Sequence, residues 1–171
     1  MKITSIEIGK LTIPLIKPFK TALRTLSISE TLVIKVHLDN GLIGWGAASP
    51  TAVITGDILG SIKGALTEVL IPHLIGMDIL NYEAVIAKIN SGMVRNNSTK
   101  AALDMAIYDL IGQIYHAPLY KFLGGHKNSF ETDITVSVNS PEEMATDAIN
   151  AVRDKFTVLK VKVGLDSKID L

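Results

Sequence analysis

A strand, a helix and a second strand follow one another in the last part of the chain. Residues 131–138 alternate polar and apolar side chains, and residues 157–163 form a second β-prone run. Between them, residues 140–143 (Ser-Pro-Glu-Glu) combine an N-cap serine, a proline at the first helical position and a glutamate three residues on. Such a unit builds a parallel sheet. It constrains the fold strongly, because one unit alone cannot bury both faces of that sheet.

The second predicted strand carries two lysines, Lys160 and Lys162. They are two residues apart, so their side chains point to the same face, while Leu159, Val161 and Val163 form an apolar face on the other side. One interpretation is a solvated, charged strand. The other is a barrel strand whose lysines line an active site, where each ammonium disfavours the charged form of its neighbour. Only the rest of the chain can decide between them.

The N-terminal part predicts a three-stranded antiparallel meander. Strands are expected at residues 2–14, 31–38 and 42–47 from their apolar alternation. Residues 39–41 (Asp-Asn-Gly) predict the turn of a hairpin, because Asn and Gly tolerate positive φ. Residues 15–29 are expected to form a polar, basic loop, which at this length is more often functional than idle.

Helices are expected in the middle of the chain. Residues 57–70, 82–90 and 98–115 show apolar spacing near 3.6 residues. Ser98 is the predicted N-cap of the longest of these helices.

Composition excludes several classes of function. Seventeen basic and seventeen acidic side chains give a net charge of zero, so no electrostatic footprint for nucleic acid or an anionic membrane is present. The sequence has no cysteine and its four histidines are scattered without metal-ligand spacing. No signal peptide or membrane span is predicted. We therefore expect a cytoplasmic protein.

Two stretches carry a resemblance to a known family. Residues 104–113 (Asp-Met-Ala-Ile-Tyr-Asp-Leu-Ile-Gly-Gln) and residues 159–164 (Leu-Lys-Val-Lys-Val-Gly) resemble the enolase superfamily, in its muconate-lactonizing subgroup. Residues 17–25, 53–57 and 132–143 are most similar to dipeptide epimerases of the L-Ala-D/L-Glu type. The resemblance covers essentially the whole chain.

The resemblance implies an α+β fold with two domains. Residues 1–126 would be the enolase-like N-terminal capping domain, made of the meander and the helices. Residues 127–171 would be the first βαβ of a (β/α) barrel of the TIM type, truncated. Because a complete barrel needs about 250 residues, we expect the chain to be a fragment or a truncated product.

The resemblance also implies roles for particular residues. Lys162 would be the base that removes a proton α to a carboxylate, and Lys160 would assist it and contact that carboxylate. Thr135 would lie at the substrate. Arg24 would pair with the glutamate side chain of a dipeptide, because a guanidinium suits a carboxylate. Mg²⁺ would be the cofactor, but its ligands and the opposing base are expected beyond residue 171, so no metal ligand is assigned here and the chain alone is expected to be inactive.

Alternatives remain open. Residues 44–48 (Gly-Trp-Gly-Ala-Ala) place Ala47 where the family usually has a glutamate, which leaves the substrate less certain than the fold. A muconate cycloisomerase or an o-succinylbenzoate synthase shares the two lysines. A catalytically inactive fragment is a further alternative. The partner expected is a small dipeptide substrate, with no nucleic acid and no membrane, and a homo-oligomer is left open.

Overall fold

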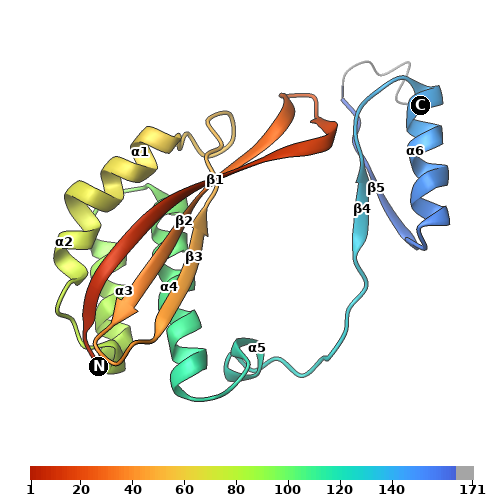
Figure 1. Cartoon of the computed structure of the whole chain (residues 1–171). Coiled ribbons are helices and arrows are strands. Elements are labelled where there is room, and N and C mark those ends of the chain that lie inside the picture. Colours follow the sequence, from red (N-terminus) through yellow and green to blue (C-terminus); the bar gives the residue numbers. More distant parts are fainter. Residues whose placement is uncertain (165–171) are drawn as a thin grey trace. The chain divides into compact units, whose positions relative to one another are not determined.

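The structure is a computed structural model that describes residues 1–164 (Figure 1). It divides into two compact units. The N-terminal unit comprises residues 1–12 and 30–126, and the C-terminal unit comprises residues 13–29 and the residues from 127 on. The assignment of residues 1–126 and 127–171 to two domains stays a prediction.

Three strands open the chain in the order β1-β2-β3 (Figure 1). They are β1 (Ile3–Lys20), β2 (Thr25–Leu38) and β3 (Ile43–Ala48), with β2 and β3 antiparallel. The predicted hairpin turn between β2 and β3 is confirmed: Gly41 has φ +88° and its N–H donates to the carbonyl of Leu38 at 3.1 Å. Glycine at this position relieves the steric cost of positive φ.

The predicted loop at residues 15–29 is wrong. β1 continues to Lys20 and β2 begins at Thr25, so only residues 21–24 lie outside the two strands. The prediction ended the first strand at Pro14 and Pro18. A proline is tolerated in an edge strand, because the N–H it lacks would have faced away from the neighbouring strand, and β1 is at the edge of the sheet.

The predicted helices are confirmed, with shifted ends. The first is extended as α1 (Leu59–Gly64), a π-helical segment (Ala65–Leu70) and α2 (Ile71–Leu74). The others are a short 3₁₀ turn (Ile79–Asn81), α3 (Tyr82–Ser91), α4 (Asn97–Ile114) and α5 (Leu119–Phe122). The π-helical segment lies just before Pro72, whose ring would clash with the carbonyl four residues earlier in a regular helix.

The core of the N-terminal unit lies between its sheet and these helices (Figure 1). Alternate residues of β2 are buried on the helix side: Leu32, Ile34, Val36 and Leu38. Helix α4 contributes seven buried residues to the same unit: Thr99, Ala102, Leu103, Ala106, Ile107, Leu110 and Ile111. The long helix therefore organises the packing of this unit.

Helix α4 packs against β3 at two glycines. A Cβ at Gly46 would lie 1.8 Å from the carbonyl oxygen of Ala102, and a Cβ at Gly44 would lie 2.2 Å from that of Ala106. Both distances are far below van der Waals contact. Only glycine permits this approach, and the alanines on the helix keep its own surface flat.

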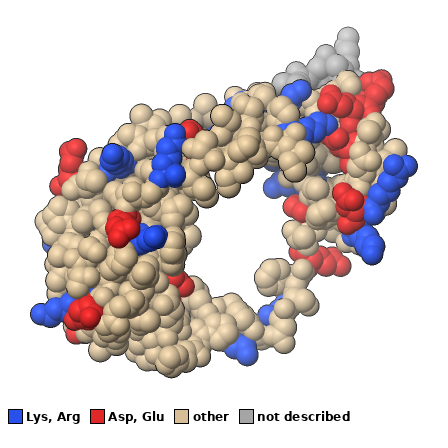
Figure 2. All heavy atoms as spheres, in the orientation of Figure 1, with Lys and Arg blue, Asp and Glu red and all other residues tan. Residues whose placement is uncertain are grey.

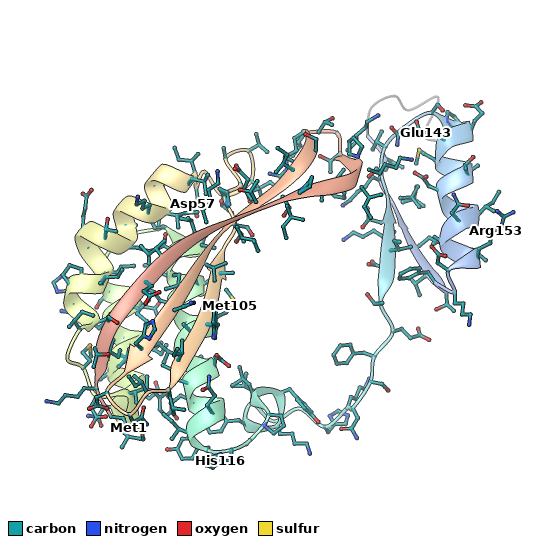
Figure 3. The ribbon with its side chains drawn as sticks, in the orientation of Figure 1. Met1, Asp57, Met105, His116, Glu143 and Arg153 are labelled. Atoms are coloured by element: carbon teal, nitrogen blue, oxygen red, sulfur yellow. The ribbon has the colours of Figure 1, made fainter. Side chains whose placement is uncertain are left out.

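A carboxylate from another segment holds the N-terminus of α4. The predicted N-cap, Ser98, is wrong: the helix begins at Asn97, and Ser98 lies inside its first turn. The backbone N–H of Ser98 donates to a carboxylate oxygen of Asp57 at 3.2 Å. Asp57 is 7% exposed and is labelled in Figure 3. A carboxylate there satisfies an unpaired N–H and complements the helix dipole.

The C-terminal unit contains the predicted βαβ. Its elements are β4 (Asp133–Val136), α6 (Pro141–Arg153) and β5 (Val158–Val161), and the two strands are parallel. The predicted cap of α6 is confirmed, because the Ser140 hydroxyl accepts from the N–H of Glu143 at 3.3 Å. Figure 3 labels Glu143 and Arg153 near opposite ends of this helix.

The face of the molecule shown in Figure 2 carries no dominant charge. Basic and acidic side chains are interspersed over the face shown in Figure 2, as the net charge of zero leads one to expect. Among residues 1–164, the helices are too short or too polar to cross a membrane.

The contact between α4 and β3 makes a stability prediction. Gly46→Ala should lower the free energy of unfolding by about 1–3 kcal/mol or more, because the added methyl group overlaps a backbone carbonyl. Urea denaturation measures the change. Gly9→Ala in β1 is the matched control, since no atom lies within 4 Å of the place that a Cβ on Gly9 would take. Equal midpoints for the two variants would contradict the close contact.

The capping carboxylate makes a second prediction. Asp57→Ala should lower the free energy of unfolding by about 0.5–2 kcal/mol, as expected for loss of a helix cap. Ser98→Ala should change it by less than about 0.5 kcal/mol, because the Ser98 hydroxyl lies inside the first turn and is not the cap. Thermal or urea unfolding of both variants checks the contrast. A larger loss for Ser98→Ala than for Asp57→Ala would restore the serine as the cap.

Candidate functional site

The register of β4 and β5 sets which side chains meet. Thr135 pairs with Lys160, with apolar pairs on either side of them. Neighbouring residues of paired strands point to the same face, so Thr135 and Lys160 lie side by side. Lys162 follows β5 on the same alternation, and its backbone N–H donates to the carbonyl of Val136 at 3.1 Å. Lys160 is exposed and Lys162 is half-buried.

The opposite face of this two-stranded sheet is apolar and meets α6. Val136 of β4 and Ala151 of α6 are buried, and both line a groove together with Ile134, Thr135 and Asn150. By the alternation of side chains along the strands, Thr135 and the two lysines belong to the other face. The predicted apolar face of β5 is only partly covered by the described residues, because Val161 is 52% exposed.

The turn that carries Arg24 is closed by its own hydrogen bonds. The N–H of Thr21 donates to the carbonyl of Arg24 at 2.9 Å, and the N–H of Arg24 donates back to the Thr21 hydroxyl at 3.2 Å. Arg24 is half-buried. At the tip of the turn, Cβ of Ala22 lies 3.6 Å from where a Cβ on Gly164 would be. The structure thus brings this turn to the chain just beyond Lys162.

Lys20, which the sequence did not single out, binds this turn to the segment that follows β4. The N–H of Lys20 donates to the Ser137 hydroxyl and its carbonyl accepts from the N–H of Val138, both at 3.3 Å. Its side-chain Nζ donates to Oδ1 of Asn139 at 2.6 Å. Lys20 and Asn139 are 119 residues apart in the sequence, and no local pattern signals their contact.

A second lysine of β1 reaches helix α6. Lys17 Nζ lies 2.8 and 2.6 Å from the two carboxylate oxygens of Asp147 and 3.3 Å from a carboxylate oxygen of Glu143. The hydrogen bond to Asp147, helped by Glu143, raises the pKa of Lys17 above its ordinary value. The side chains of Lys17 and Glu143 are exposed and that of Asp147 is half-buried, so the cluster joins β1 to α6 near the surface.

The two carboxylates of α4, Asp104 and Asp109, lie in the packing of the N-terminal unit, whereas the two lysines belong to the C-terminal unit. Asp109 accepts from the backbone N–H of Trp45 at 2.9 Å and from the side-chain amide of Gln113 at 3.1 Å, which ties the helix to β3. Burial raises the pKa of Asp104. Ala47 lies in β3 on the face opposite to the one that α4 covers, paired with Val33.

A metal site is not formed by the part of the chain that the structure describes. Within residues 1–164 no three His, Cys, Asp or Glu side chains come together in a way that could hold an ion. The described residues therefore do not fit the Mg²⁺ that the resemblance implies, and what they supply is the lysine and threonine face and the Arg24 turn.

Comparison with known proteins agrees with the fold and with this arrangement of segments. The family profile "Mandelate racemase / muconate lactonizing enzyme, N-terminal domain" matches residues 4–124. An L-Ala-D/L-Glu epimerase from Clostridium acetobutylicum is 49% identical over 171 residues, which are 100% of this chain and 48% of that protein. The chain spans about half the length of such relatives.

Solved structures agree as well. The substrate-liganded complex of the L-Ala-D/L-Glu epimerase from Bacillus subtilis matches with a TM-score of 0.96 and 48% identity, over 99% of this chain and 47% of that chain. A dipeptide epimerase from Enterococcus faecalis, complexed with Mg and L-Leu-L-Tyr, matches with a TM-score of 0.94 and 32% identity, over 99% of this chain and 48% of that chain.

These matches confirm the predicted capping-domain and barrel-start fold. The profile covers most of the N-terminal unit, and the structural matches continue through β4, α6 and β5. The chain belongs to the enolase superfamily, in the mandelate racemase and muconate lactonizing enzyme family.

Proposed function

We propose that the whole protein, of which this chain forms the N-terminal part, is an epimerase that removes and returns a proton α to a carboxylate. The observation that carries the proposal is the register of β4 and β5, which sets Thr135 beside Lys160 with Lys162 on the same face. In a (β/α) barrel the chemistry takes place at the C-terminal ends of the strands, and Lys162 directly follows β5.

The two lysines divide the work. Lys162 accepts the α-proton from one face of the substrate as an amine and becomes an ammonium; inversion is completed when the opposing base delivers a proton to the other face of the same carbon. Lys160 contacts the substrate carboxylate as a cation. Thr135 lies next to Lys160 and supplies a hydroxyl to the same carboxylate. The hydrogen bond from Lys162 to Val136 fixes the backbone of the base.

Arg24 selects the substrate. The guanidinium of a half-buried arginine pairs well with a carboxylate, so a dipeptide with a glutamate side chain is the proposed substrate class. Support comes from the identity of 48–49% to L-Ala-D/L-Glu epimerases, against 32% to the relative solved with L-Leu-L-Tyr. A cytoplasmic location stays a prediction from the sequence.

The proposal places Mg²⁺ and the opposing base outside the described residues. Structures of related dipeptide epimerases are complexed with Mg. The coding sequence beyond Leu171 gives a direct check: we expect three carboxylates at strand ends and a further lysine. A stop codon directly after Leu171 would instead favour the inactive fragment.

The assignment of the base is tested by isotope exchange. In D₂O with MgCl₂, the whole protein should exchange the α-hydrogen of the glutamate residue in L-Ala-L-Glu, followed by ¹H NMR. Lys162→Ala should reduce this exchange by about 10²-fold or more, as expected for loss of a general base. Lys63→Ala, on the exposed surface of α1, is the control and should exchange normally. Normal exchange by Lys162→Ala would refute the role of this lysine.

The role of Arg24 is tested by substrate charge. Arg24→Ala should lower kcat/KM for L-Ala-L-Glu by about 10- to 100-fold, because a hydrogen bond between charged groups contributes about 1.5–3 kcal/mol. For the uncharged isostere L-Ala-L-Gln, the same substitution should change kcat/KM by less than about threefold. Steady-state kinetics on both dipeptides measures the difference. No loss on the acidic dipeptide would remove Arg24 from the site.

A further inference from the structure

Lys20 is bound to the segment after β4 by three hydrogen bonds. Its backbone N–H and carbonyl are both used, by Ser137 and Val138, so the end of β1 continues the hydrogen bonding along that segment. The side chain adds a contact of 2.6 Å to Asn139 Oδ1. Both Lys20 and Asn139 are half-buried. A short hydrogen bond from a charged donor, partly shielded from water, is among the stronger kinds.

The position of Arg24 follows from that of Lys20. Thr21 is the next residue after Lys20, and it is joined to Arg24 by hydrogen bonds in both directions. The N–H of Leu23 also donates to the Thr21 hydroxyl, at 3.3 Å. The turn is therefore a closed loop with few internal degrees of freedom, so fixing Lys20 fixes the backbone of Arg24.

The ion pairs of Lys17 on the same strand contribute less to holding the turn in place. Lys17 pairs with Asp147 and Glu143; its side chain is 43% exposed, that of Glu143 is 48% exposed and that of Asp147 is 25% exposed. Exposed ion pairs contribute little, because water screens them and two long side chains must be ordered. Lys20 is the residue on which the placement of the turn depends.

We propose that Lys20 is a positioning residue for substrate recognition, which acts through Asn139 and the segment after β4 to hold Arg24 over the ends of β4 and β5. The proposal rests on the proposed function for its consequence in catalysis. Its structural part, the anchoring of the turn, stands separately.

Limited trypsin digestion tests the anchoring without any assay of activity. Trypsin cleaves after arginine, so the Arg24–Thr25 bond reports on opening of the turn, and mass spectrometry follows the fragment that begins at Thr25. Lys20→Met and Asn139→Ala in the whole protein should speed this cleavage by about fivefold or more, because local opening becomes easier. Lys20→Arg should restore the wild-type rate.

Lys10→Met is the matched control for this digestion. Lys10 lies on the same strand β1 but pairs with Glu30, so its loss should leave cleavage after Arg24 unchanged. Equal cleavage rates in the wild type, Lys20→Met and Asn139→Ala would overturn the anchoring role. Acceleration by Lys10→Met as large as by Lys20→Met would overturn it too, because the effect would then be general to the strand.

A kinetic double-mutant cycle tests the consequence for recognition. Lys20→Met should raise KM for L-Ala-L-Glu by about 5- to 20-fold with a smaller change in kcat, and should have little further effect once Arg24→Ala is present, because coupled residues are not additive. A full effect in the Arg24→Ala background, or an equal rise in KM for L-Ala-L-Gln, would overturn positioning through Arg24. If the wild-type protein does not act on dipeptides, the proposed function is wrong. The trypsin digestion then still tests whether Lys20 holds the turn in place.

Discussion

The parallel register of β4 and β5 is the constraint on which the site depends. Pairing Thr135 with Lys160 places these two side chains on one face and the apolar pairs Ile134–Leu159 and Val136–Val161 on the other. A slip of one residue would turn the lysines toward the helix and the apolar side chains away from it, which costs burial of apolar area and desolvates two ammonium groups. The hydrogen bond from Lys162 to Val136 extends this register one residue beyond β5. The same register therefore sets which apolar side chains face α6 and where the two lysines and Thr135 lie.

The sequence predicted what depends on local periodicity. Alternation along residues 157–163 placed Lys160 and Lys162 on a common face, whereas Thr135 was assigned to the site by the family resemblance. The residues 39–41 and 140–143 predicted their turn and helix cap, because those motifs act over three or four residues. Such features are read from neighbours in the chain, and the structure has them where the pattern indicated.

Features that depend on distant partners could not be predicted in this way. The cap of α4 comes from Asp57, which is 41 residues from the N–H it binds, so the nearby Ser98 was a reasonable but wrong choice. The length of β1 depends on its place at the sheet edge, where prolines are tolerated. The contact between Lys20 and Asn139 spans most of the chain. In each case a tertiary neighbour overrode the local signal.

In the segment from Lys17 to Arg24, the groups that hold the turn in place differ from the side chain that we propose for substrate recognition. The hydrogen bonds that close the turn use the hydroxyl and N–H of Thr21, the N–H of Leu23 and only the backbone of Arg24. The bonds that hold the turn to β4 belong to Lys20. The side chain of residue 24 takes part in neither set, so it can be exchanged while the backbone stays in place. If Arg24 recognises the substrate as we propose, a change of this side chain alone would change the charge of the substrate accepted, without rebuilding the fold that presents it.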